Sequence, residues 1–110
     1  MAEVFKNASL VDVNNVSADT LYTAPAATTS IVLGAAIANK SANTVGITLS
    51  MTDTSAGTTT QMIPEVQIPG NTTLEVLAGQ KYILETTDVL TAQADTASSI
   101  DITMGVLELS

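Results

Sequence analysis

The stretch TVGITLSMTDTSAGTTTQM, residues 44–62, alternates apolar with small polar side chains, breaks at a turn and begins to alternate again. In an extended chain Val45, Ile47, Leu49 and Met51 lie on one side, and Thr, Ser and Gly lie on the other. A period of two is typical of a half-buried β-strand, and Val, Ile and Thr favour that conformation. The segment DTSAG at 53–57 predicts a hairpin loop. The stretch therefore predicts one hairpin of an antiparallel sheet.

The same reading extends to both sides of this hairpin. Short apolar segments separated by turn residues recur through the chain, for example IPGN at 68–71, and no window shows a convincing helical period. Pro64 removes a backbone donor, so the return strand of the hairpin should lie at an edge or be interrupted. About eight short strands spaced in this way predict an all-β fold: a single antiparallel β-sandwich or jelly-roll-like barrel.

Two segments are apolar or small on both faces. In residues 31–38 strict alternation places Ile31, Leu33, Ala35 and Ile37 on one face, and the small residues Gly34, Ala36 and Ala38 on the other with Val32. Residues 100–109 likewise carry apolar side chains on both faces. A strand with two apolar faces is usually covered on both sides. Because a two-layer sandwich covers only one face of each sheet, these segments predict self-association.

Composition limits the classes of function. A chain of 110 residues forms one domain, which we divide into an N-terminal arm or first edge strand at 1–20 and a sandwich at 21–110. Hydrophobic residues make up 45% but aromatic residues only 3%, so the core must be aliphatic. The net charge is -8 with three lysines, which disfavours direct binding to nucleic acid or to an anionic membrane.

The residue types that most enzymes and metal sites need are missing. The chain has no His or Cys, which excludes the usual nucleophile–base pairs and zinc sites. Glu85, Asp88 and Asp95 read as solvated loop acids, and Asp53 offers a calcium ion a single carboxylate. We therefore predict no catalytic residues, no cofactor and no metal.

No leader peptide or membrane span is expected. Residues 1–10 lack a basic region followed by a long apolar run, and the longest apolar run, at 31–38, is far too short to span a bilayer. We expect a protein made in a cytoplasm and kept there, or in a particle assembled there.

Candidate functional residues are those of an interface. Phe5 is the only large apolar side chain near the N-terminus and could dock on a neighbour, and Tyr22 could be an exposed anchor or pack at the junction of a loop and a strand. With the small or apolar second faces of the two segments, the predicted interface residues are Phe5, Leu10, Tyr22, Ala36, Ala38, Leu107 and Leu109.

Three phrases carry a resemblance to a known group of proteins: LYTAPAATTSIVLGAAIANKSANTVGITLSM from Leu21, IPGNTTLEVLAGQKYILETTDVLTA from Ile68 and SSIDITMGVLEL from Ser98. They resemble small virion structural proteins of tailed bacteriophages, particularly of marine and cyanobacterial phages. The first twenty residues lie outside the resemblance. The matching residues, such as Pro69-Gly70 and Gly79, are of the kinds expected in turns and strands.

The resemblance implies a non-enzymatic structural protein of a virion that is assembled in the host cytoplasm. The first choice is a capsid decoration or cement protein, and the alternative is a component of the neck, tail or baseplate. A carbohydrate-binding module is less favoured, because stacking on sugars needs exposed aromatic rings. The implied partners are further copies of the chain, as a homotrimer or ring, and the phage major capsid protein or another virion protein.

Overall fold

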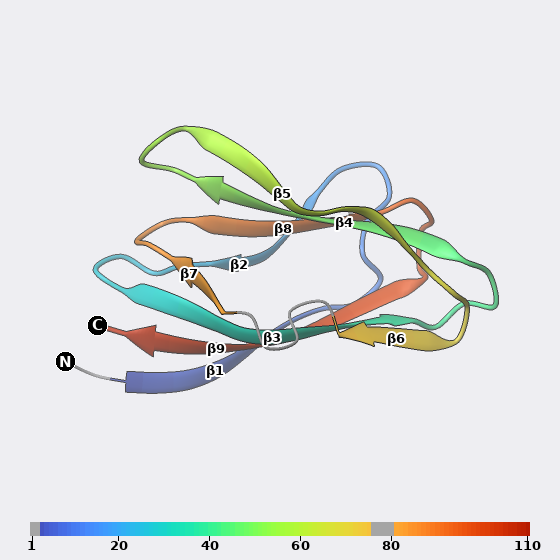
Figure 1. Ribbon diagram of the computed structural model, residues 1–110, viewed down its shortest axis with the longest axis horizontal. Helices are drawn as coiled ribbons and strands as arrows, with labels where there is room; N and C mark the ends of the chain where they lie inside the picture. The colour runs from blue at the N-terminus through green and yellow to red at the C-terminus, as the bar shows by residue number, and fades with distance from the viewer. Residues whose placement is uncertain (1–2, 76–80) are drawn as a thin grey trace.

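The computed structural model describes residues 3–75 and 81–110, which form nine β-strands in two layers (Figure 1). The strands are β1 (Glu3–Leu10), β2 (Asp19–Thr23), β3 (Thr29–Asn39), β4 (Val45–Asp53), β5 (Thr58–Ile68), β6 (Thr72–Glu75), β7 (Tyr82–Leu84), β8 (Val89–Ala94) and β9 (Ile100–Leu109). The described residues contain no helix, so none of them forms a helix that could cross a membrane. The prediction of an all-β sandwich is confirmed.

Each layer is an antiparallel sheet. Sheet A has the order β1-β9-β3-β6, and β7 pairs with the other end of β3. Sheet B has the order β2-β8-β4-β5. When β6 and β7 are counted as two pieces of one interrupted strand, the pairs are nested around the β4–β5 hairpin: β3 with β6 and β7, β2 with β8, and β1 with β9. This is the wrapped-hairpin arrangement of a jelly roll.

The core lies between the sheets and is aliphatic, as the composition requires. Its largest fully buried side chains are Ile37, Ile47, Ile68, Leu84, Ile100, Ile102 and Met104. Val45, Ile47 and Leu49 of β4 all point into it, so the predicted alternation of the opening stretch is correct. Residues 54–57 form the predicted turn.

The edge position predicted from Pro64 is also confirmed. β5 is the outer strand of sheet B, and its pairing with β4 shifts register on both sides of Leu49. The residue after the proline, Glu65, has a φ of 43°, a value that side-chain-bearing residues seldom adopt. The proline therefore coincides with a distorted edge.

The faces predicted for residues 31–38 need a correction. A bulge at Leu33 shifts the register of β3 against β9 between Val32 and Gly34. Val32, Ala35 and Ile37 are buried, whereas Ile31 is half-buried and Leu33 is exposed. Strict alternation places Ile31 on the same face as Ala35 and Ile37, which is the core face. A bulge inserts one extra residue and reverses the alternation beyond it, so Ile31 lies on the outer face instead.

Candidate interaction surface

The outer face of sheet A carries a row of apolar side chains that crosses four strands. The register places Phe5 beside Leu107, Leu107 beside Ile31, and Ile31 beside Ile83. These residues belong to β1, β9, β3 and β7. Ile31, Ile83 and Leu107 point away from the core because their strand neighbours Val32, Leu84 and Val106 are buried. Phe5 lies directly opposite Leu107 and therefore points to the same face. Phe5 is 74% exposed and Ile83 is 60% exposed. We call these four residues the apolar row.

The apolar row continues toward the middle of the sheet as a flat patch. Gly34 and Gly105 lie side by side in the register, and a Cβ atom added to either would meet no atom within 4 Å. Ala36 follows on β3, and the exposed Leu33 flanks the pair at the bulge. The absence of side chains here leaves backbone open to close approach by another molecule.

The far end of the same face is charged. Ala38 lies beside Asp101, and the Lys40 ammonium lies 3.0 Å from the Asp101 carboxylate and 2.5 Å from that of Asp12. Hydrogen bonding to Asp12 and then Asp101 raises the pKa of Lys40, and the backbone N–H of Asp12 lowers the pKa of the Asp101 carboxyl. The outer face of sheet A therefore grades from apolar near the chain termini to ionic at the opposite end.

The structure gathers five of the seven predicted interface residues on this face. Phe5 and Leu107 belong to the apolar row, and Leu109 extends it along β9. Ala36 and Ala38 lie farther along β3. Leu10 is half-buried and packs against the core. Ile83, the second most exposed member of the row, was not predicted because nothing in a three-residue strand marks which face is outward.

Tyr22 joins the two sheets instead of lying on the outer face. Its hydroxyl lies 2.8 Å from the Ser30 hydroxyl and donates a hydrogen bond to the Glu108 carboxylate at 2.5 Å. The Lys6 ammonium lies 3.1 Å from the same carboxylate, of which only 10% is exposed. Tyr22 belongs to sheet B and the other three residues belong to sheet A. We call these four residues the inter-sheet clasp.

The clasp shifts the titration of both acidic groups in it. Burial, and then the hydrogen bond to Glu108, raises the pKa of Tyr22 to about 12. The hydrogen bond from Tyr22, with a further contribution from Lys6, lowers the pKa of Glu108. The clasp thus favours a neutral phenol beside an ionised carboxylate.

Three carboxylates that looked separate in the sequence meet at the end of the sandwich near the termini. Ligand atoms of Asp53, Glu85 and Asp88 lie within 4.8 Å of one another. The buried Asp88 carboxylate accepts hydrogen bonds from the backbone N–H groups of Thr54 and Glu85. Asp53 accepts bonds from the Ser55 hydroxyl and the backbone N–H of Ala56, which lower its pKa. The bond from Thr54 to Asp88 ties the β4–β5 turn to the β7–β8 turn, and the other bonds hold each turn internally. Asp53 and Asp88 therefore have structural roles.

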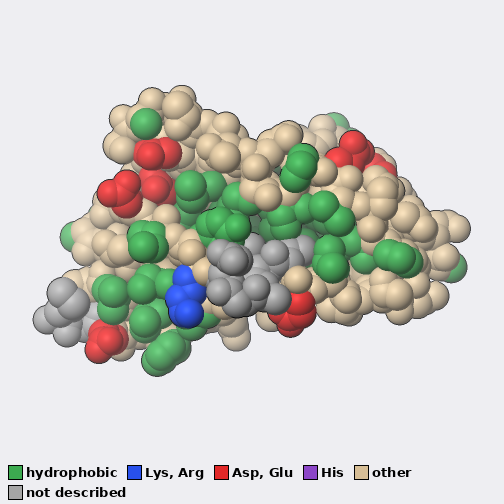
Figure 2. All heavy atoms as spheres, viewed as in Figure 1, with side chains coloured by type: hydrophobic (Ala, Val, Ile, Leu, Met, Phe, Trp, Pro, Cys, Tyr) green, Lys and Arg blue, Asp and Glu red, His purple; other side chains and the backbone are tan. Residues whose placement is uncertain are grey.

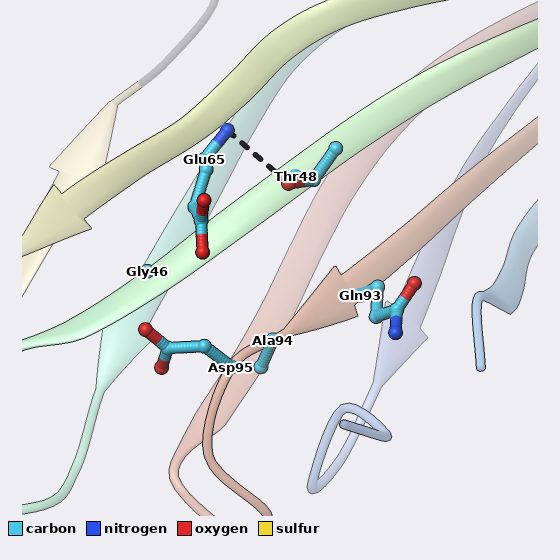
Figure 3. A pocket seen from close by; sticks show the side chains of 6 residues that line it. All are labelled: Gly46, Thr48, Glu65, Gln93, Ala94 and Asp95. Atoms are coloured by element: carbon cyan, nitrogen blue, oxygen red, sulfur yellow. Dashed lines mark hydrogen bonds between the residues drawn. The ribbon is translucent and has the colours of Figure 1, made fainter. Parts of the chain in front are cut away.

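A second acidic grouping lines a shallow hollow on the outer face of sheet B. The hollow has a volume of about 240 Å³ and is lined by Gly46, Thr48, Glu65, Gln93, Ala94 and Asp95. Figure 3 shows the Glu65 and Asp95 carboxylates on opposite sides of Gly46, and the backbone N–H of Glu65 donates to the Thr48 hydroxyl. A Cβ atom on Gly46 would lie 3.0 Å from an Asp95 carboxylate oxygen, so the glycine makes the hollow possible. Both acids are exposed to solvent.

A space-filling view shows how hydrophobic and charged side chains are distributed on one face of the molecule (Figure 2). Figure 2 shows hydrophobic side chains along the middle of the face that exposes both layers, with acidic side chains in several separate places and little basic surface. Among the residues that the structure describes, this face therefore shows no concentrated positive charge to attract a polyanion (Figure 2).

Comparison with known proteins identifies the fold and not a family. The sequence matches no family model and no curated protein. Among solved structures, the chain is similar to a protein of Bacillus endospore appendages, described as a novel family of disulfide-linked pili, with a TM-score of 0.55, 10% identity and coverage of 98% of this chain and 88% of that one. It is also similar to VP2 in the infectious bursal disease virus subviral particle, with a TM-score of 0.52 and 11% identity. That match covers 96% of this chain, which spans 32% of the VP2 chain.

Proposed function

We propose that the protein is a non-enzymatic structural protein of a bacteriophage particle, and that it decorates or cements the capsid shell. The observation that carries the proposal is the apolar row with its adjoining Gly34–Gly105 patch on the outer face of sheet A. A soluble protein seldom leaves a contiguous apolar face open unless another surface covers it. The major capsid protein, or another virion protein, is the proposed partner of this face.

Two further observations support a structural role over catalysis. The Asp53, Glu85 and Asp88 carboxylates have hydrogen-bonding roles in turns or lie in solvent, and the hollow over Gly46 is small and open. The fold is also shared with VP2, a protein of a viral particle, although this likeness concerns the fold alone. The sequence phrases that resemble virion proteins supply the link to phages.

A component of the neck, tail or baseplate is the second candidate. The likeness to a pilus protein favours it, because that protein uses the same fold in a filament. A carbohydrate-binding module is less favoured, since no aromatic residue lines the hollow over Gly46.

Electron microscopy of intact particles separates these candidates. Density for the protein on the shell would support decoration, and density at the neck or tail would support the second candidate. Absence from purified particles would overturn both.

A binding assay with the purified shell tests the surface. The Ile83→Lys variant should lose binding because it places a charge in the apolar row, whereas the matched Thr91→Lys variant on the outer face of sheet B should bind normally. If the Ile83→Lys variant binds the shell as well as the Thr91→Lys variant and the unsubstituted protein do, the proposed face is excluded.

A further inference from the structure

The two sheets offer four edges in the described part of the chain, and three of them are poorly suited to pairing with another strand. β2 has five residues and a register shift between Thr20 and Tyr22. β5 is distorted at Pro64 and Glu65. The edge beyond β3 is divided between β6 and β7, which have four and three residues. Short, bulged or proline-bearing strands are the usual protection against edge-to-edge association.

The fourth edge, β1, lacks these protections. It pairs with β9 through eight consecutive residues, from Glu3 beside Leu109 to Leu10 beside Ile102, without a register shift. It contains neither Pro nor Gly, and its residues 3–7 are all exposed. Its one basic residue, Lys6, is engaged with Glu108 on the inner side. The backbone groups on its free side are therefore available for hydrogen bonds with an extended strand.

The apolar row reaches this open edge and stops there. Phe5, its most exposed residue, lies on β1, and the row runs back from it through Leu107 to Ile31. A twofold axis beside Phe5 would place the same row of a second copy directly beyond it. From this geometry we infer that β1 pairs antiparallel with β1 of a second copy, with Phe5 opposite Phe5. The two sheets A then form one continuous sheet with one continuous apolar row.

The side-chain pattern selects this register. Residues directly opposite each other in a sheet point to the same face, so the twofold axis must pass beside a residue of β1 and not between two residues. An axis at Lys6 would set two ammonium groups opposite each other, and an axis at Asn7 would set Phe5 against Ser9 and interrupt the row. An axis at Phe5 sets Lys6 opposite Val4 and Glu3 opposite Asn7.

The inference goes beyond the proposed function, because the pairing can be measured on the purified protein whether or not a particle binds it. A twofold contact uses the same surface on both subunits and closes at a dimer. It therefore gives a pair in place of the trimer or ring expected from the sequence. The rest of the apolar row remains free for a shell.

Cysteine cross-linking tests the register in this cysteine-free chain. In the Glu3→Cys, Asn7→Cys double variant, the thiol at position 3 of one copy lies opposite the thiol at position 7 of the other. Mild oxidation should then convert most of the protein to a covalent dimer. In either single variant the two thiols lie about 14 Å apart, too far for a disulfide. Efficient cross-linking of a single variant, or none in the double variant, would overturn the register.

Native mass spectrometry at tens of micromolar tests the pairing itself. We expect a dimer, and the Phe5→Asp substitution should weaken it by at least about tenfold, because two carboxylates would meet at the axis. Phe5 is exposed, so circular dichroism should show that the variant remains folded. Val16→Asp is the matched control, since Val16 is 83% exposed in the β1–β2 loop. A monomer, a trimer, or a dimer that withstands Phe5→Asp would overturn the inference.

Discussion

The two sheets contribute aliphatic side chains to one core but present different chemistry to the outside. Corresponding rows can be followed across four strands in each outer face. In sheet B the row reads Thr20, Thr91, Ser50, Gln61. In sheet A it reads Phe5, Leu107, Ile31, Ile83. Because a two-layer sandwich covers only one face of each sheet, the fold does not require an apolar row on the outer face of sheet A. The difference between the two rows supports the proposal that this face binds a partner.

The edge strands of the two sheets also differ: the long edge of sheet B is distorted, and the β1 edge of sheet A is regular. The pairing of β5 with β4 in sheet B is interrupted at Pro64 and resumes at Val66, whereas the pairing of β1 with β9 in sheet A is regular along its whole length. Sheet B is thus polar on its face and distorted at its long edge, and sheet A is apolar and open. In the stretch at 44–62, Val45, Ile47 and Leu49 therefore fill the core while the Thr and Ser side chains of β4 face outward. The contrast supports the proposal that sheet A is the half that binds a partner.

The largest expected effect is a difference in unfolding free energy between substitutions on the inner and the outer face of β9. Ile102→Ala should lower the free energy of unfolding by about 2–5 kcal/mol, because Ile102 is 1% exposed and its truncation leaves a cavity. Leu107→Ala, on the opposite face of the same strand, should cost about 1 kcal/mol or less. Urea denaturation of both variants checks this. Similar losses would mean that the apolar row belongs to the folding core.

The next effect concerns the contact between the sheets. Tyr22→Phe removes the hydroxyl that donates to Glu108 and should cost about 1–3 kcal/mol, since the acceptor is a nearly buried carboxylate. Thr23→Val, a neighbouring exposed position on β2, is the control. Thermal unfolding monitored by circular dichroism measures both. An unchanged melting temperature in Tyr22→Phe would show that the clasp contributes nothing to holding the sheets together.

The clasp also predicts how stability depends on pH. The pKa of Glu108 is lowered by folding, so its contribution is complete above the ordinary value of 4.5 and is lost as the pH falls through the folded value. The pKa of Tyr22 is raised from 10.0 to about 12, so its contribution is complete below pH 10 and is lost as the pH rises toward 12. Denaturation at a series of pH values should show both losses. Glu108→Gln should remove most of the acid loss, and an unaltered profile would exclude the clasp as its source.

The smallest effect is expected at the charged end of sheet A. Lys40→Met removes an exposed ion pair with Asp12 and Asp101, and exposed pairs contribute little and are screened by salt. The melting temperature should fall less than in Tyr22→Phe, and the difference from the unsubstituted protein should shrink further in 1 M NaCl. A large, salt-independent loss would mean that this end is held as firmly as the clasp.

The parts of the structure that could be predicted from the sequence are those decided locally. Alternation in β4, the 53–57 turn and the interruption at Pro64 each follow from neighbouring residues. The bulge at Leu33 could not be predicted, since Ile31 and Leu33 are both apolar and strict alternation satisfies the pattern equally well. The clasp joins Tyr22 to a residue 86 positions away, and the carboxylate cluster joins Asp53 to Glu85, so both depend on strand order. Strand order is fixed by the packing of the whole core.

The nesting of the strand pairs has a consequence for the kinetics of folding. The β4–β5 hairpin closes a loop of four residues, whereas β1 meets β9 only when the two ends of the chain come together (Figure 1). The entropy lost on closing a loop grows with its length, so each inner pair brings the next pair closer and reduces its cost. We expect the hairpin to form early and β1 to dock last, which pulse-labelling of amide hydrogens during refolding would detect as late protection of Glu3–Leu10. Until that step β9 has no partner on the side where β1 will pair. The first strand of a neighbouring chain could pair there instead. Late docking of β1 would therefore allow two subunits to exchange their first strands.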